Sequence, residues 1–226
     1  MKSDKLGKIL RTIAIILVGL TAAMNILGGV GTTCAAFLTK QFPPMWALMD
    51  YRWLYQLFVI VTVAIGLVGV WTTIGLARGR KNAYRDTLIV LAAGTLVGAV
   101  HMIASLALRG KAVPANVKLY INALTLVYAL SLRLPGLRER VTFSEESAGA
   151  DRATAAGMAA IVSGFTVLSV SYWAAPSHTY AGENWVYVLR TPIYLTGGLL
   201  LVAGFIQLAR VVLDAYRQEA AAKSSA

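Results

Sequence analysis

Residues 87–108 read TLIVLAAGTLVGAVHMIASLAL, a continuous apolar run without an acidic or basic residue other than one histidine. The hydrocarbon layer of a bilayer is about 30 Å thick, and about 20 helical residues cross it at a rise of about 1.5 Å each. A strand of a membrane barrel would instead show about ten residues of alternating polarity. This stretch therefore predicts a transmembrane α-helix.

Five further stretches have the same character. The 226 residues are 58% hydrophobic, with a mean hydropathy of +0.66, whereas soluble domains are roughly half apolar. We expect an all-α, polytopic integral membrane protein with six transmembrane helices, near residues 12–38, 53–77, 87–108, 114–134, 153–175 and 191–213.

The connections predict how these spans are organised within one transmembrane domain, residues 1–226. The longest polar stretch, residues 135–152, is expected to be a cytoplasmic linker between a four-helix part (1–134) and a two-helix part (153–217). Residues 218–226 are small and polar, which predicts a flexible tail. The apolar part of the first span is too long for a secretory signal peptide, so we expect a retained helix.

The basic residues are distributed unequally around these spans. The net charge is +11, but the Lys and Arg side chains lie at span ends, so phospholipids explain them better than nucleic acid does. Of the 21 Lys and Arg residues, fifteen lie on the side of the termini and six on the other. The positive-inside rule therefore predicts an inner (cytoplasmic) membrane protein with both termini in the cytoplasm.

One polar face stands out within the third span. Gly94, Gly98, His101 and Ser105 are spaced four, three and four apart, so they share one face of a helix. Such a small, polar face is expected to point into the helix bundle. Because ionisable groups are costly in lipid, His101 is a candidate functional residue.

The next span is joined to this one by a short link. Gly110 suits a helix end and Pro114 a first helical turn, which predicts a helical hairpin. Positions equidistant from its centre lie at similar depth, so we expect His101 and Asn122 to be neighbours. Either they join two helices through a hydrogen bond of about 1 kcal/mol, or they line a pocket for a polar headgroup, quinone or pigment.

Three other polar residues are candidates for ligand binding. Asn25, near the middle of the first span, either joins the polar interior or serves helix packing. Arg109 and Lys118 flank the hairpin mouth, where they either extend to the interface or meet phosphate or carboxylate groups. No cofactor is identified. Haem ligated by two histidines of this chain is not expected, since His178 lies in an outer loop.

The motifs of several catalytic classes are missing from the sequence. Cys34 is the only cysteine, which excludes an internal disulfide and multi-cysteine metal sites. The chain contains no HExxH or CxxC motif and no Gly-rich phosphate loop. We therefore expect neither a catalytic nor a metal site. Small glycine faces on several spans favour close helix packing and a protein partner or homo-oligomer.

These features favour a non-catalytic membrane protein, either an accessory or assembly subunit of a complex or a binder of a lipid or hydrophobic ligand. Two alternatives stay open. Six helices with small outer loops resemble the S-components of vitamin-uptake transporters, which implies a substrate-capture subunit. His101 also allows a membrane enzyme or a pigment- or haem-binding protein.

Overall fold

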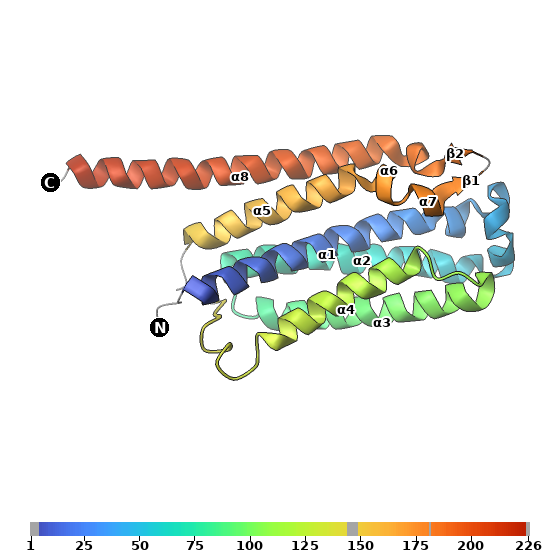
Figure 1. The fold of residues 1–226 in the computed structure, drawn as a ribbon, viewed down its shortest axis with the longest axis horizontal. Coiled ribbons are helices and arrows are strands. Elements are labelled where there is room, and N and C mark those ends of the chain that lie inside the picture. Colours follow the sequence, from blue (N-terminus) through green and yellow to red (C-terminus); the bar gives the residue numbers. More distant parts are fainter. Residues whose placement is uncertain (1–4, 144–148, 181, 225–226) are drawn as a thin grey trace. The chain divides into compact units, whose positions relative to one another are not determined.

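The computed structural model describes residues 5–143, 149–180 and 182–224. The chain divides into two compact units. Unit 1 comprises Met1–Leu20, Ile74–Lys81 and Glu139–Ala226, and unit 2 comprises Thr21–Thr73 and Asn82–Arg138. The helices α1 (Lys5–Phe37) and α2 (Arg52–Arg78) each contribute residues to both units (Figure 1). One unit boundary lies between Arg138 and Glu139, and residues 1–20 and 74–81, which the sequence analysis placed in the four-helix part, are grouped with residues 139–226.

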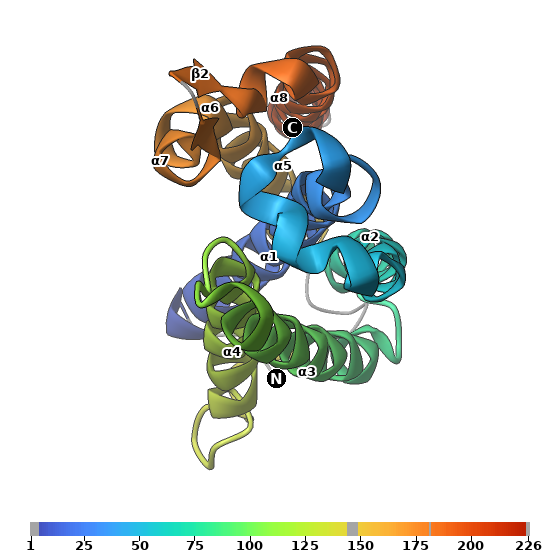
Figure 2. The same cartoon turned by 90° about the vertical axis from the view of Figure 1, so that its right-hand side faces the viewer.

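Unit 2 is built mainly from long helices. Beyond α1 come two short 3₁₀ helices, η1 (Thr39–Gln41) and η2 (Pro43–Tyr51), then α2, α3 (Ala83–Arg109) and α4 (Ala115–Ser131). α3 ends as predicted at Gly110, which has a positive φ of 66° and whose N–H donates to the carbonyl of Leu106. The helices α3 and α4 pack side by side (Figure 2).

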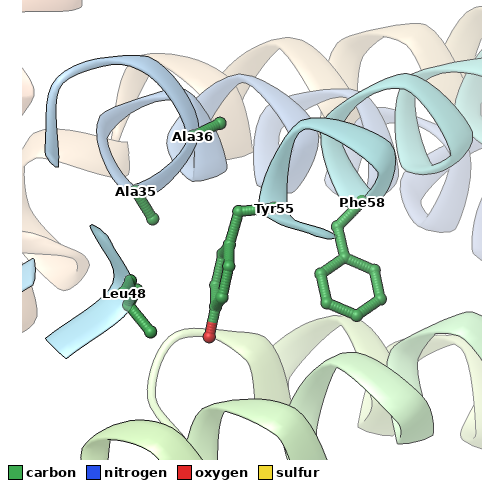
Figure 3. Packing of buried hydrophobic residues seen from close by; sticks show 5 residues of the cluster. All are labelled: Ala35, Ala36, Leu48, Tyr55 and Phe58. Atoms are coloured by element: carbon green, nitrogen blue, oxygen red, sulfur yellow. The ribbon is translucent and has the colours of Figure 1, made fainter. Parts of the chain in front are cut away.

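A small apolar cluster closes one end of unit 2. Figure 3 shows its five buried members, with the Tyr55 ring lying between Leu48 and Phe58. The Tyr55 hydroxyl points toward the ribbon below it in the figure and lies 3.2 Å from Ser105 Oγ of α3. This cluster fixes the aromatic side chains that surround the candidate site described below. Its members are Ala35, Ala36, Leu48, Tyr55 and Phe58.

Unit 1 contains the second long helix pair, α5 (Gly149–Leu168) and α8 (Arg190–Ser224). Between them lie α6 (Val170–Trp173), α7 (Ala175–His178), the two-residue strands β1 (Thr179–Tyr180) and β2 (Glu183–Asn184), and η3 (Trp185–Leu189). The strands are antiparallel, with Thr179 opposite Asn184. α5 and α8 run alongside each other (Figure 1).

Glycines allow α5 and α8 to approach closely. A Cβ on Gly204 would lie 2.8 Å from the carbonyl oxygen of Gly157, and one on Gly164 would lie 2.9 Å from that of Gly197. Both distances are too short for a real side-chain carbon. The backbones therefore touch at two places seven residues apart along each helix, as expected for helices packed through small residues.

The predicted all-helical character is confirmed for the described residues, apart from β1 and β2. Within the described residues, four segments are long and apolar enough to cross a membrane: Lys5–Phe37, Pro43–Arg78, Ala83–Arg109 and Arg190–Ala222. The helices α4, with 17 residues, and α5, with 20, are not among them. The structure thus supports a membrane protein with four candidate spans.

Three predicted boundaries differ from the structure. The span expected at 153–175 is interrupted at Ser169, whose hydroxyl donates to the carbonyl of Thr166, and the helix resumes as α6. The linker expected at 135–152 ends earlier, because α5 begins at Gly149; residues 144–148 lie outside the described residues. The tail expected at 218–226 is helical through Ser224, since its Gln, Glu and Ala residues favour helix, and residues 225–226 are not described.

Candidate functional site: a buried polar seam in unit 2

Polar side chains from three helices meet inside unit 2. We call this set the polar seam; it comprises Thr21, Asn25, Thr32, His101, Lys118, Asn122 and Thr125, all of which are buried. On α4, residues 118, 122 and 125 recur at intervals of four and three, so they share the helix face that is buried. The seam is therefore the meeting line of the polar faces of α1, α3 and α4.

The predicted inward face of α3 is confirmed. Gly94, Gly98, His101 and Ser105 are all buried. Helix α4 packs directly against these two glycines. A Cβ on Gly94 would lie 2.1 Å from Asn122 Oδ1, and one on Gly98 would lie 2.9 Å from Leu119 Cα. The GxxxG spacing of Gly94 and Gly98 therefore serves packing within the chain.

Two amide side chains join α1 to α4. Asn25 Nδ2 donates to Asn122 Oδ1 over 3.1 Å, and Asn122 Nδ2 donates back to Asn25 Oδ1 over 3.0 Å. Asn122 Nδ2 also donates to the carbonyl of Lys118 over 2.7 Å. One turn along, the hydroxyls of Thr21 and Thr125 are 2.7 Å apart. Asn25 is thus part of the polar seam.

Lys118 points into the seam instead of toward the membrane surface. Only 5% of the residue is exposed, and its Nζ lies 2.8 Å from His101 Nδ1 and 3.5 Å from Thr32 Oγ1. Gly28 makes room for its side chain, since a Cβ there would lie 2.5 Å from Lys118 Cδ. A lysine ammonium has only donors, so His101 Nδ1 accepts this bond and the ring proton lies on Nε2.

Aromatic rings hold the imidazole in place. Phe58 stacks on His101 with ring centroids 4.3 Å apart and an interplanar angle of 10°. Tyr55 meets the same imidazole edge-on, at 5.4 Å and 83°. Since Tyr55 is itself fixed by Ser105, the orientation of His101 is determined by both α2 and α3. The candidate residue Ser105 therefore acts on His101 through Tyr55.

Arg109 is a second cation at this end of the seam. Its Nε is buried and has no hydrogen-bond partner among the described residues. Lys118 contacts His101, and Arg109 lies four positions after the buried Ser105 on α3. No carboxylate in the described part of the chain forms an ion pair with either cation. The region around His101 is thus rich in donors and in positive charge.

The prediction that His101 and Asn122 are neighbours is wrong. Asn122 lies opposite Gly94, seven positions, or about 10 Å, along α3 from His101, and Lys118 occupies the place opposite the imidazole. The link residues before Ala115 run back beside α3 instead of forming a symmetric turn (Figure 1). The link turns at Val113 and Pro114, where the N–H of Asn116 donates to the carbonyl of Ala112, so α4 does not begin symmetrically opposite the end of α3.

Two seam residues, Thr21 and Thr32, were not predicted from the sequence. Thr21 lies four positions before Asn25 and Thr32 seven positions after it, so all three lie on the same face of α1. Lys118 lies four positions before Asn122, so the same periodicity predicts that it faces inward. The stacking of Phe58 on His101 has no local sequence signal, because it depends on how α2 packs against α3.

Among the described residues, no group of three or more His, Cys, Asp or Glu side chains is placed to hold a metal ion. Comparison with protein-family models, with curated proteins and with solved structures gives no match to this chain.

Proposed function

We propose that this chain is a non-catalytic, multi-pass protein of the inner (cytoplasmic) membrane that binds a lipid or hydrophobic ligand through unit 2. The observation that carries this proposal is Lys118, a buried cation without a carboxylate partner among the described residues. A charge inside a transmembrane bundle is costly, so such residues commonly serve ligand or ion binding. A bound ligand would supply the missing partner.

The proposed topology has six spans, with α4 and the α5–α6 segment as the two additional crossings and both termini in the cytoplasm. It is supported by the distribution of Lys and Arg, fifteen on the side of the termini against six on the other. The 17 residues of α4 would extend about 26 Å, close to the hydrocarbon thickness of a thin bilayer.

An accessory or assembly subunit that docks through glycine-rich faces receives less support. Gly66 and Gly69 contact α1, and Gly94 and Gly98 contact α4. Gly157 and Gly164 of α5 contact Gly204 and Gly197 of α8, respectively. These surfaces are occupied within the chain, so ligand binding by the polar seam is the function that we favour.

Native mass spectrometry of the full chain, extracted in a mild non-ionic detergent, tests this function. We expect a stoichiometric small molecule on the wild-type protein that is largely absent from Lys118→Met. Lys111→Met is the matched control, because Lys111 is exposed in the same hairpin and should retain the molecule. A wild-type spectrum with only the bare protein mass, or equal retention by Lys118→Met, would contradict the proposal.

A further inference from the structure

We infer that Lys118, Arg109 and His101 form an anion site for the carboxylate or phosphate group of an amphipathic molecule. This inference rests on the proposed function and names the chemistry of its ligand. The three side chains come from both helices of the hairpin, α3 and α4, and they lie at the end of the seam nearest the link.

Each of these three side chains has a donor without a close hydrogen-bond partner. Lys118 Nζ has three N–H groups, of which one reaches His101 Nδ1 and a second has only a 3.5 Å contact with Thr32. His101 uses Nδ1 for Lys118, which leaves its Nε2–H available. Arg109 Nε is buried without a partner in the described part of the chain. A group that accepts several hydrogen bonds is therefore the complementary ligand.

Charge points to the same class of ligand. Lys118 contacts the imidazole and Arg109 lies farther along the same helix as His101, and neither cation is ion-paired with a carboxylate among the described residues. Removing such charges from water is costly unless an opposite charge is present. The planar guanidinium of Arg109 favours oxyanions, whose paired oxygens match its donors. A carboxylate or phosphate thus satisfies both the charge and the donors.

The surroundings indicate that the anion is attached to an apolar chain. Leu106, Val113 and Val117, which flank Arg109 and Lys118 in sequence, are all exposed. In a bilayer these side chains would contact acyl chains. A free inorganic anion would use none of this surface, whereas a fatty acid or phospholipid would place its headgroup at the cations and its tail along these residues.

A binding titration followed by native mass spectrometry tests the assignment on the purified full chain. Oleate carries a carboxylate, and oleyl alcohol has the same chain without a charge. We expect wild type to bind oleate at least about tenfold more tightly than oleyl alcohol, a difference of about 1.4 kcal/mol. Lys118→Met should lose this preference, and Lys111→Met should keep it. Arg109→Gln, at a partly exposed position, should weaken oleate binding even if Lys118→Met fails to fold.

Two further arms identify the source of the anion. Phosphatidylglycerol should compete with oleate, whereas phosphatidylcholine and inorganic phosphate should not. Competition by inorganic phosphate at oleate-like concentrations would overturn the assignment to an amphiphile. Equal binding of oleate and oleyl alcohol would overturn the anion site but leave hydrophobic ligand binding intact. If none of these amphiphiles binds, the proposed function fails together with the inference.

Discussion

Asn25 and Asn122, 97 positions apart in the sequence, exchange two amide hydrogen bonds inside unit 2. Each side chain uses both its oxygen and its nitrogen for the other, and the second N–H of Asn122 reaches the carbonyl of Lys118. Because neither residue has access to water, each is the main partner that the other has. The pair therefore fixes α1 against α4 at a single register.

Removing this pair should show strong coupling between the two sites. Asn25→Ala and Asn122→Ala are each expected to lower the free energy of unfolding by about 1 kcal/mol, because the remaining amide is left unpaired in an apolar interior. The double variant should cost less than the sum of the two. A double-mutant cycle of unfolding in detergent micelles measures this coupling. Leu124→Ala, at an exposed position of α4, is the control, and strictly additive losses would contradict the pairing.

The contact between Gly98 and the α4 backbone should tolerate no side chain. A Cβ on Gly98 would lie 2.9 Å from Leu119 Cα and 3.0 Å from its N, so the helices would have to separate. We expect Gly98→Ala to lower the free energy of unfolding by about 1–3 kcal/mol. Gly31→Ala is the control, since a Cβ at Gly31 meets nothing within 4 Å. Equal stability of the two variants would contradict this packing.

The glycine contacts of unit 1 allow a parallel test. A Cβ on Gly204 would lie 2.8 Å from the carbonyl oxygen of Gly157 and 3.0 Å from Ile161 N, whereas one on Gly198 of the same helix would meet nothing within 4 Å. Gly204→Ala is therefore expected to reduce the melting temperature of the purified protein, and Gly198→Ala to leave it unchanged or raise it. The reverse order of the two melting temperatures would rule out the described packing of α5 on α8.

Much of the fold follows from local sequence, because apolar runs of about 20 residues and a 3.6-residue period are local properties. This is why the inward face of α3, including His101 and Ser105, was predictable. The partners of His101 were not, because they depend on the path of the link before Ala115. The link places α4 about two turns from the predicted register, and this shift replaces Asn122 with Lys118 beside the imidazole.

Lys118 illustrates a second reason. A lysine near a span end ordinarily extends its ammonium toward the headgroups, so burial is not the first expectation. Its inward orientation requires Gly28, 90 positions earlier, to leave space for its methylene groups. The four-residue spacing to Asn122 was the one local signal of this orientation. Long-range complementarity of this kind cannot be identified from one helix considered alone.

The proposed topology predicts opposite accessibility for two loops. In a Cys34→Ala background, Lys111→Cys should react with a membrane-impermeant thiol reagent added to intact cells, and Lys81→Cys should not. Both positions are exposed side chains in short connections, so exposure to the reagent depends on the side of the membrane. Permeabilised cells, in which both cysteines should react, provide the control. Labelling of Lys81→Cys alone in intact cells would invert the orientation.

We infer above all that the seam holds the anionic group of an amphiphile at Lys118. An experimental density map of the wild-type protein in nanodiscs containing phosphatidylglycerol tests this most directly. We expect elongated non-protein density, with its head within hydrogen-bond distance of Lys118 Nζ and the Arg109 guanidinium. A well-resolved map in which Lys118 contacts only His101 and Thr32, without non-protein density at the cations, would contradict it.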